Sequence, residues 1–204
     1  MSAPPPRVEQ AASPADPVSR RAAVAAAALH RRSIRRYLPD PVPEPELREL
    51  LTLAGRAPSA WNLQPWRFIV VRDPETKSRL QAAANGQSQV GAAPAVIVVY
   101  SDVIDALRRA RDAKAAAYFA TLGADARDQW GKAQAGIALG YLLLIAETFG
   151  LATSPMLGFR PPAVRQLFEL PAHIEIAALV AVGYAGEEGR PSSRVAPDEI
   201  TRWI

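Results

Sequence analysis

Cysteine is absent from this sequence, and histidine occurs only as His30 and His173. Without thiols the chain can form no disulfide, thiolate nucleophile, cysteine-ligated zinc site or iron–sulfur cluster. The two histidines are distant in sequence and no HExxH pattern occurs, so a histidine-based metal site would need carboxylates to complete it. We therefore expect no metal site. The lack of cysteine fits a reducing compartment, and we expect a cytoplasmic location.

Nucleotide-binding and nucleophile motifs are also missing. The sequence contains no GxGxxG after a predicted strand, no GxxxxGK[ST] and no GxSxG. If the chain is an enzyme, its own side chains supply little nucleophilic or acid–base chemistry, and we expect no catalytic side chain. A bound cofactor then has to carry the reaction.

The apolar run Ala135–Ala146 is twelve residues long, whereas about 20 are needed to cross a bilayer. We therefore expect no membrane partner and predict a buried helix over Asp128–Gly150. Gly136 and Gly140 lie on one face of it, which allows another helix to approach closely. A helix that is apolar all round is typical of burial on two sides, as at a subunit interface.

The 204 residues suffice for one domain with a sizeable core. Prolines are frequent among Ser, Ala and Gln up to Pro17, without apolar periodicity, so residues 1–17 are predicted to be a disordered tail. The tail has no apolar segment typical of a signal peptide. A single domain is expected over residues 18–204.

Hydrophobic periodicity and cap residues predict a mixture of helices and strands. Besides Asp128–Gly150, the predicted helices are Arg20–Arg32 (capped by Ser19), Pro45–Gly55, Pro74 to about Gly86, Arg108–Leu122 and Pro162–Phe168. The predicted strands are Phe68–Val71, Val96–Tyr100, Ile174–Val182 and a short candidate at Leu151–Thr153, with a turn at Pro155–Phe159.

Positive charge is concentrated in the segment RRSIRRY, Arg31–Tyr37, of a chain with formal charge +4. Such a run is most often a solvent-exposed charged surface. A nucleic-acid-binding patch would require further basic and aromatic residues interleaved with it. A third interpretation is an anion site. If the segment is extended, Arg31, Ser33 and Arg35 share one face, and two guanidinium groups with a hydroxyl would bind a phosphate.

Small hydroxyl and amide side chains gather in the stretch APSAWNLQPWRFIVV, Ala57–Val71, just before a predicted strand. Ser59, Asn62 and Gln64 lie in its loop, and Asn and Gln side chains both donate and accept hydrogen bonds, so they can bind the edge of a heterocycle. A tryptophan-rich core corner with a polar turn is an equal alternative for this stretch alone.

Together these two stretches resemble the FMN-dependent nitroreductase family. The resemblance continues through NGQSQV and APAVIVV, through AETFGLATSPMLGF and into the C-terminal tail, from about Ala26 onward. It implies an α+β fold with a central, mostly antiparallel sheet surrounded by helices. It also implies an intertwined homodimer with one FMN site at each subunit interface.

The resemblance assigns roles to particular residues. Residues matching the family's phosphate-binding positions are Arg31, Arg32, Ser33, Arg35 and, in the tail, Arg194. Residues matching the loop that a partner subunit presents to the flavin are Pro58, Ser59 and Asn62. Residues matching the turn along the flavin ring are Pro155, Met156, Leu157 and Gly158, with the backbone N–H of Leu157 facing flavin N5. Gln89 matches a position near the pyrimidine edge.

Three positions depart from the family pattern. Ser192 and Gln89 stand where family members carry lysines, and Leu157 stands where many carry an acidic residue. Losing two cations near the cofactor affects its affinity and potential. Two-subunit FMN binding does not depend on these positions.

The mechanism that the resemblance implies is ping-pong. NAD(P)H reduces the flavin at N5 and leaves, and a small electron-poor acceptor, such as a nitroaromatic compound or a quinone, then takes two electrons in the same slot. The alternatives are a flavin-binding protein without turnover, a flavin-fragmenting enzyme, and a nucleic-acid-binding module. The flavin-fragmenting enzyme typically has an acidic residue where Ser33 stands, which disfavours it, and we expect no nucleic-acid partner.

Overall fold

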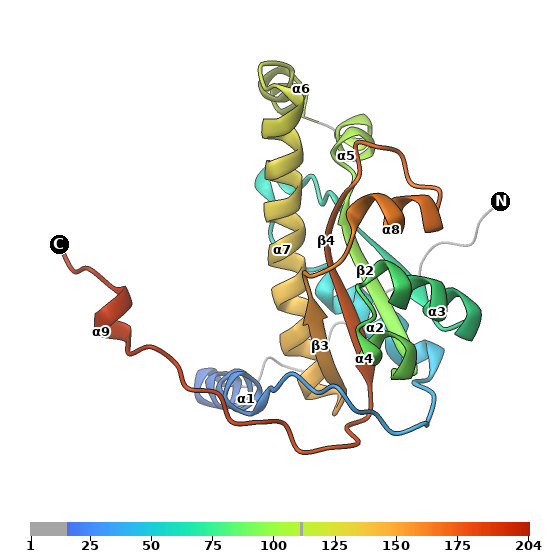
Figure 1. Ribbon diagram of the computed structural model, residues 1–204. Coiled ribbons are helices and arrows are strands. Elements are labelled where there is room, and N and C mark those ends of the chain that lie inside the picture. The colour runs from blue at the N-terminus through green and yellow to red at the C-terminus, as the bar shows by residue number, and fades with distance from the viewer. Residues whose placement is uncertain (1–15, 111) are drawn as a thin grey trace.

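The computed structural model describes residues 16–110 and 112–204, and its centre is a four-stranded antiparallel sheet (Figure 1). The strands are β1 (Trp66–Val71), β2 (Ala95–Ser101), β3 (Ala152–Met156) and β4 (Glu175–Gly183). Their spatial order is β1-β2-β4-β3, so β1 and β3 form the two edges. The predicted α+β class with a mostly antiparallel sheet surrounded by helices is confirmed. Of the predicted N-terminal tail, residues 1–15 lie outside the described residues.

Helices cover both faces of this sheet. They are α1 (Pro17–His30), α2 (Glu44–Ala54), the short 3-10 helix η1 (Ala60–Asn62), α3 (Pro74–Ala83), α4 (Ser88–Ala92), α5 (Val103–Arg109), α6 (Ala113–Ala120), α7 (Ala124–Thr148), α8 (Pro161–Leu167) and α9 (Pro197–Ile200). Helices α2 and α7 pack on one face, and α3, α4 and α8 pack on the other (Figure 1). The result is a three-layer arrangement with a hydrophobic core on each side of the sheet.

Strand β2 shows why the central strands are continuous apolar runs. Ile97 and Val99 belong to the core under α7, whereas Val96 and Val98 belong to the core under α3. Successive residues of a strand point to opposite faces, and both faces are covered here. Each side chain of this kind stabilises the fold by about 1.5–3 kcal/mol when it is fully buried.

Helix α7 is the long predicted helix and begins four residues earlier than Asp128. The side facing the sheet is buried and consists of Gly131, Ala135, Ala138, Leu142 and Ala146. On the opposite side Ile137 and Tyr141 are 38% and 41% exposed. A Cβ atom added at Gly136 or Gly140 would meet nothing within 4 Å in the same chain. A single chain therefore buries α7 on one side only.

Two helix predictions are corrected. Helix α1 is capped by Asp16 rather than by Ser19: Asp16 Oδ1 accepts hydrogen bonds from the backbone N–H groups of Val18 and Ser19, at 2.9 and 3.2 Å. The predicted helix over residues 108–122 is in fact the end of α5 and the separate helix α6. Asp112 caps α6 by accepting from the N–H of Lys114 at 2.8 Å, and such a side-chain cap starts a new helix.

The turn predicted at Pro155–Phe159 begins too early, because β3 continues through Pro155 and Met156. The carbonyl of Thr153 accepts a hydrogen bond from Ile34 N–H at 3.1 Å, so Thr153 and, two residues later, Pro155 present their backbone groups to the outer side of this edge strand. The missing N–H of Pro155 therefore costs no bond to β4, which is why an edge strand tolerates it.

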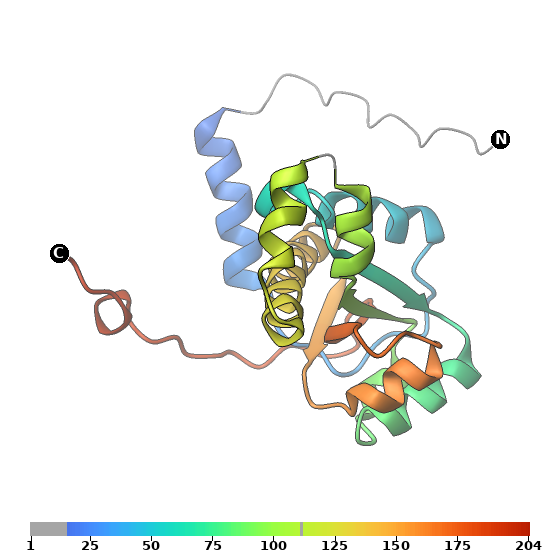
Figure 2. The ribbon, with the colours of Figure 1, turned by 90° about the horizontal axis from the view of Figure 1, so that it is seen from above.

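The basic segment after α1 runs along this edge of the sheet. Ser33 forms an isolated parallel bridge with Thr153, and Tyr37 forms an antiparallel bridge with Ala185. The C-terminal tail then leaves the body of the chain and ends beyond α9 (Figure 2), and every residue in 191–204 is exposed. Within residues 16–110 and 112–204, no helix has both the length and the apolar character needed to span a membrane.

Candidate functional site

Within the basic segment Arg31–Tyr37, residues 32–35 alternate between two cavities. Arg32 and Ile34 line one, of about 210 Å³, and Ser33 and Arg35 line the other, of about 520 Å³. This alternation is expected of an extended segment, and it places Ser33 and Arg35 on one side. The larger cavity is completed by Arg36, Ser88, Glu187, Glu188 and Arg190. It thus holds three guanidinium groups and two carboxylates, a net charge of one positive unit.

Glu187 fixes the backbone of this segment. Its Oε1 accepts hydrogen bonds from the N–H groups of Arg35 and Arg36 at 2.9 and 3.2 Å. The bond from Arg35 holds the pKa of Glu187 below its ordinary value, with further contributions from the backbone N–H and the charge of Arg36. The carboxylate therefore stays ionised and keeps the guanidinium groups of this segment near the cavity.

Arg31 carries the clearest sign of a missing partner. Its Nη1 atom is buried and has no hydrogen-bond partner among the described residues. A buried charged nitrogen without a partner is costly, so such groups are normally completed by an anion. Arg31 lies two positions before Ser33 but is not among the residues that line either cavity. Arg31, with its unpartnered nitrogen, and the larger cavity, with Ser33 and Arg35, each fit an anionic group such as a phosphate.

Arg32 is turned away from that group. Its Nη1 donates to the carbonyl oxygens of Leu29 and Arg31 at the end of α1. Its side chain also packs against Gly189, where an added Cβ would lie 2.3 Å from Arg32 Cβ. The structure therefore does not bring Arg32 together with Ser33 and Arg35, and its phosphate role stays a prediction.

The predicted flavin turn lies where β3 ends. Pro155 and Met156 are strand residues, and the chain turns at Leu157 and Gly158. Leu157 is 73% exposed. Its backbone N–H donates no hydrogen bond to any residue that the structure describes, so it is free to donate to a ligand. Gln89 lies on α4, where its side chain is buried and donates to Gln87 Oε1 at 3.2 Å.

The loop that carries Pro58, Ser59 and Asn62 has an unusual backbone. Trp61, Asn62 and Gln64 have φ angles of 49°, 52° and 46°, in the left-handed region that side chains other than glycine rarely adopt. Internal bonds define this shape: Ser59 Oγ accepts from Gln64 N–H at 2.9 Å, and Asn62 Oδ1 accepts from Gln64 Nε2 at 2.9 Å. Strained backbone of this kind persists where its surroundings determine it, and it is common at binding sites.

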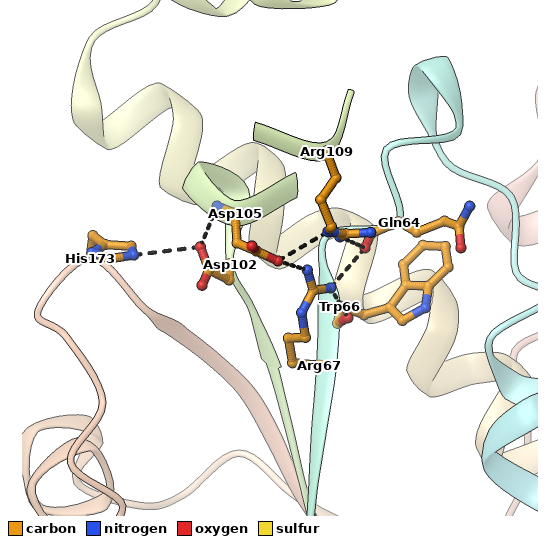
Figure 3. Close-up of polar contacts among 7 residues, drawn as sticks. All are labelled: Gln64, Trp66, Arg67, Asp102, Asp105, Arg109 and His173. Atoms are coloured by element: carbon orange, nitrogen blue, oxygen red, sulfur yellow. Dashed lines mark hydrogen bonds and ion pairs between the residues drawn. The ribbon is translucent and has the colours of Figure 1, made fainter. Parts of the chain in front are cut away.

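An ion-pair network holds the far end of the loop (Figure 3). The carbonyl of Gln64 accepts from Arg67 Nη1 at 3.0 Å and from Arg109 Nη2 at 3.5 Å. Asp105 pairs with both arginines and so connects β1 to α5. The hydrogen bond from Arg67, followed by that from Arg109, holds the pKa of the Asp105 carboxyl below its ordinary value, while desolvation acts in the opposite direction.

Asp102 extends this network toward β4 (Figure 3). Its backbone N–H donates to the carbonyl of Pro65 at 2.8 Å, and its Oδ1 accepts from the N–H of Asp105 at 2.9 Å. His173 Nε2 lies 3.5 Å from the same Oδ1, which is an ion-pair distance without hydrogen-bond geometry. The start of α5 and the loop before β1 are thus joined through backbone as well as side chains.

Aromatic side chains form one wall beside the loop. Trp61 is 42% exposed and packs against Tyr118 and Phe119 of α6, at centroid distances of 5.2 and 5.9 Å. It also lines a cavity of about 420 Å³ together with Asn62, Gln64 and residues of α5. Trp61 is therefore a surface residue beside a cavity, whereas Trp66 is the tryptophan in the core.

The predicted site residues fall into separate groups within one chain. Ser33, Arg35 and the Leu157 turn lie at the β3 edge, and Ser59 and Asn62 precede β1 at the opposite edge. Arg194 lies on the exposed tail and bonds only to Ser192 and Ser193 among the described residues. No cavity that we describe is lined by both edge groups.

Several residues at these sites were missed from the sequence. The Asn85-Gly86 pair indicated only the end of a helix, although such a pair also predicts a left-handed turn. Asp105 and Arg109 have the i, i+4 spacing that predicts an ion pair on the surface of a helix. The pairing of Asp105 with Arg67, 38 residues away, leaves no local signal.

Comparison with known proteins agrees with this fold. The model of the nitroreductase family matches residues 28–184. A Thermus thermophilus protein named NADH dehydrogenase is 51% identical over 192 residues, covering 87% of this chain and 94% of that protein. A Bacillus subtilis protein named a putative NAD(P)H nitroreductase is 31% identical, covering 85% and 93%.

A solved structure supports the same assignment. A putative nitroreductase of Exiguobacterium sibiricum, determined in complex with FMN, has a TM-score of 0.80 at 27% identity and covers 89% of this chain and 97% of its own. The three-layer fold and the basic segment at the sheet edge thus define a nitroreductase-like protein. The chain belongs to the nitroreductase family.

We predict that the Asp105 network stabilises the chain in a pH-dependent way. Asp105→Asn should lower the free energy of unfolding at pH 7 by about 1 kcal/mol or less, because both ion pairs are partly exposed. The folded-state pKa lies below the unfolded value of about 3.9, so this stabilisation is present above that pH and is lost as the pH falls through the folded value. Urea unfolding should show the difference between the two proteins shrinking as the pH falls below about 4.

The control is Asp198→Asn, a neutralisation in the exposed tail at a residue with no ion pair in the described structure. It should leave the pH profile unchanged. A difference between Asp105→Asn and the unmodified protein that stays constant at every pH would contradict a role for the ionised carboxylate.

Proposed function

We propose that this chain is an FMN-dependent oxidoreductase that transfers two electrons from NAD(P)H to small electron-poor acceptors such as nitroaromatic compounds and quinones. The observation that carries the proposal is the buried Arg31 Nη1 without a partner, in the same extended segment as Ser33 and Arg35. This donor set fits the phosphate of FMN. The names of the relatives, which include an FMN reductase [NAD(P)H] of Bacillus subtilis at 29% identity, support the same cofactor and reductant.

The protein's own groups bind and orient in this proposal. Arg31, Ser33 and Arg35 would hold the phosphate, Gln89 would lie near the pyrimidine edge, and the free N–H of Leu157 would donate toward N5. When bound, FMN supplies the two-electron chemistry that no side chain of this protein offers. A preoriented backbone donor costs no reorganisation during the reaction, which is why its fixed geometry matters.

We further propose that the two substrates use the same slot in turn, in a ping-pong reaction. The sequence has no dinucleotide-binding motif, so nicotinamide has no separate pocket of the usual kind. The cavity beside Trp61 offers an aromatic wall on which flat rings can stack. We expect NAD(P)H and the acceptor to occupy this slot alternately.

The complete site in this proposal belongs to an intertwined homodimer. The two groups of site residues lie at opposite edges of one sheet, so one chain offers two half-sites. The middle of the outer side of α7 carries a stripe of exposed small and apolar residues, Ala133, Gly136, Ile137, Gly140 and Tyr141. The exposed tail carries Arg194, Trp203 and Ile204 away from the body, as expected of a segment that packs on another subunit.

Removing single arginines tests the phosphate site. A charge-assisted hydrogen bond contributes about 1.5–3 kcal/mol, so Arg31→Ala and Arg35→Ala should each weaken FMN binding by about 10- to 150-fold in fluorescence titrations of the cofactor-free protein. Arg79→Ala, on the exposed side of α3, is the matched control and should bind FMN normally. Unchanged affinity in both test variants would rule out the assignment.

A leucine on the outer side of α7 tests the dimer. Gly140→Leu has open space in its own chain, so the subunit should still fold, but close approach of a second helix would be blocked. Light scattering should find a smaller species that has lost FMN. Ser78→Leu, exposed on α3 at the other face of the sheet, should stay dimeric. A folded, FMN-loaded monomer of the unmodified protein would refute the dimer.

Anaerobic stopped-flow spectroscopy tests the reaction itself. The flavin absorbance of the FMN-loaded protein should bleach on mixing with NADH or NADPH, and addition of a quinone should restore it. Because the two substrates share one slot, double-reciprocal plots should give parallel lines. If neither nicotinamide bleaches the flavin, the protein binds flavin without acting as a reductase.

A further inference from the structure

The carbonyl oxygen of Gly158 accepts two side-chain amide hydrogen bonds. Asn85 Nδ2 donates to it at 3.0 Å and Gln87 Nε2 donates at 2.8 Å. A carbonyl oxygen has two lone pairs, so these donors saturate it. Both come from the short connection between α3 and α4, more than 70 residues away in sequence. They therefore fix the orientation of the peptide group that follows Leu157 and Gly158.

The connection that carries these donors has a constrained backbone. Asn85 and Gly86 have φ angles of 56° and 76°, both in the left-handed region. Gly86 N–H donates to the carbonyl of Gln81 at 2.9 Å, and Gln81 Nε2 reaches back to the Gly86 carbonyl at 3.3 Å. Asparagine tolerates this conformation better than most residues, so it combines the turn with an amide donor.

The turn after β3 is also held on its far side. The backbone N–H of Arg160 donates to the carbonyl of Ala83 at 2.9 Å, at the end of α3. On its near side Met156 still pairs with Leu179 in the sheet. Leu157 therefore lies between a strand residue and a peptide group held by Asn85 and Gln87, although its own N–H has no partner among the residues described.

The amide of Gln87 connects this turn to Gln89. The Gly158 oxygen can only accept, so the NH₂ group of Gln87 must face it and the Gln87 oxygen must face the other way. That oxygen accepts from Gln89 Nε2 at 3.2 Å, and Gln89 is only 6% exposed. One continuous chain of amides thus runs from Gln89 through Gln87 to the turn.

We propose that Asn85 and Gln87 are positioning residues that orient the Leu157–Gly158 turn, so that the free N–H of Leu157 is fixed for the reaction, and that Gln87 makes this orientation depend on Gln89. This inference rests on the proposed FMN site. In that site, Gln89 and the Leu157 N–H would contact two different edges of the flavin ring. The chain of amides keeps these two groups at a fixed separation. Neither Asn85 nor Gln87 needs to touch the cofactor for this role.

The test uses variants that keep size but lose the donor. Asn85→Asp retains tolerance of the left-handed backbone, and Gln87→Glu retains the shape, but each places an acceptor against the Gly158 oxygen. Gln87→Met also removes the donor and adds no charge. Gln166→Glu, the same chemical change at an exposed position of α8, is the control. If Gln87→Glu and Gln87→Met have the same effect, that effect comes from loss of the donor and not from the added charge.

Hydrogen exchange on the cofactor-free protein is the first measurement. The amide of Arg160, whose N–H donates to the carbonyl of Ala83, should exchange about tenfold faster in Asn85→Asp and in both Gln87 variants, the change expected when the hydrogen bonds that hold this turn are lost. The control should match the unmodified protein. Unchanged exchange in all three test variants would overturn the proposal, whether or not the chain binds FMN.

Anaerobic reduction of the FMN-loaded protein by NADH is the second measurement. The rate constant should fall about tenfold or more in the test variants, because small misplacements of reacting groups have large kinetic effects. FMN affinity should change less than about threefold, since the phosphate contacts are intact. A parallel loss of affinity and rate, or an unchanged rate, would overturn the positioning role. Failure of the unmodified protein to bind FMN would instead refute the proposed function.

Discussion

Burial of both faces of one small sheet is the constraint on which the rest of this molecule depends. The central strands give one set of side chains to the core under α2 and α7 and the other set to the core under α3, α4 and α8. In the part of the chain that the structure describes, neither face of the sheet is left to bind a ligand. Polar chemistry is therefore confined to the strand ends and edges, where the basic segment, the turn after β3 and the loop before β1 all lie. The candidate site is peripheral because the side chains on both faces of the sheet are already buried in the core.

The same constraint explains what could be predicted from the sequence. Strands β2 and β4 are covered on both sides, so they are unbroken apolar runs and were found almost to the residue, and the alternation of Ser33 and Arg35 followed from an extended segment. The break between α5 and α6 was missed because it depends on one aspartate cap. The orientation of Arg32 depends on where α1 ends, and the pairing of Arg67 with Asp105 joins segments that only the fold brings together.

Two segments of exposed backbone in this chain are held in place by long polar side chains. Among the left-handed residues of the loop, Gln64 is held by two arginines that donate to its carbonyl oxygen, and the carbonyl oxygen of Gly158 is held by two side-chain amides in the same manner. In both places long side chains bond to backbone carbonyl oxygens, and at the turn after β3 the N–H of Leu157 has no partner among the described residues. The local backbone geometry is thus set by residues that need no contact with a ligand. The shape of these segments and the chemical groups that they expose are therefore determined by different residues.

The outward position of Pro155 has a consequence for association between chains. An uncovered edge strand is a template on which other strands can add, and repeated addition leads to aggregation. Here β3 offers no N–H at Pro155, and Ile34 already occupies the Thr153 carbonyl, so the row of free backbone groups is interrupted in two places. Continuous sheet growth across this edge is blocked. Association of another chain through this edge would therefore depend on which side chains fit together and not on generic backbone pairing.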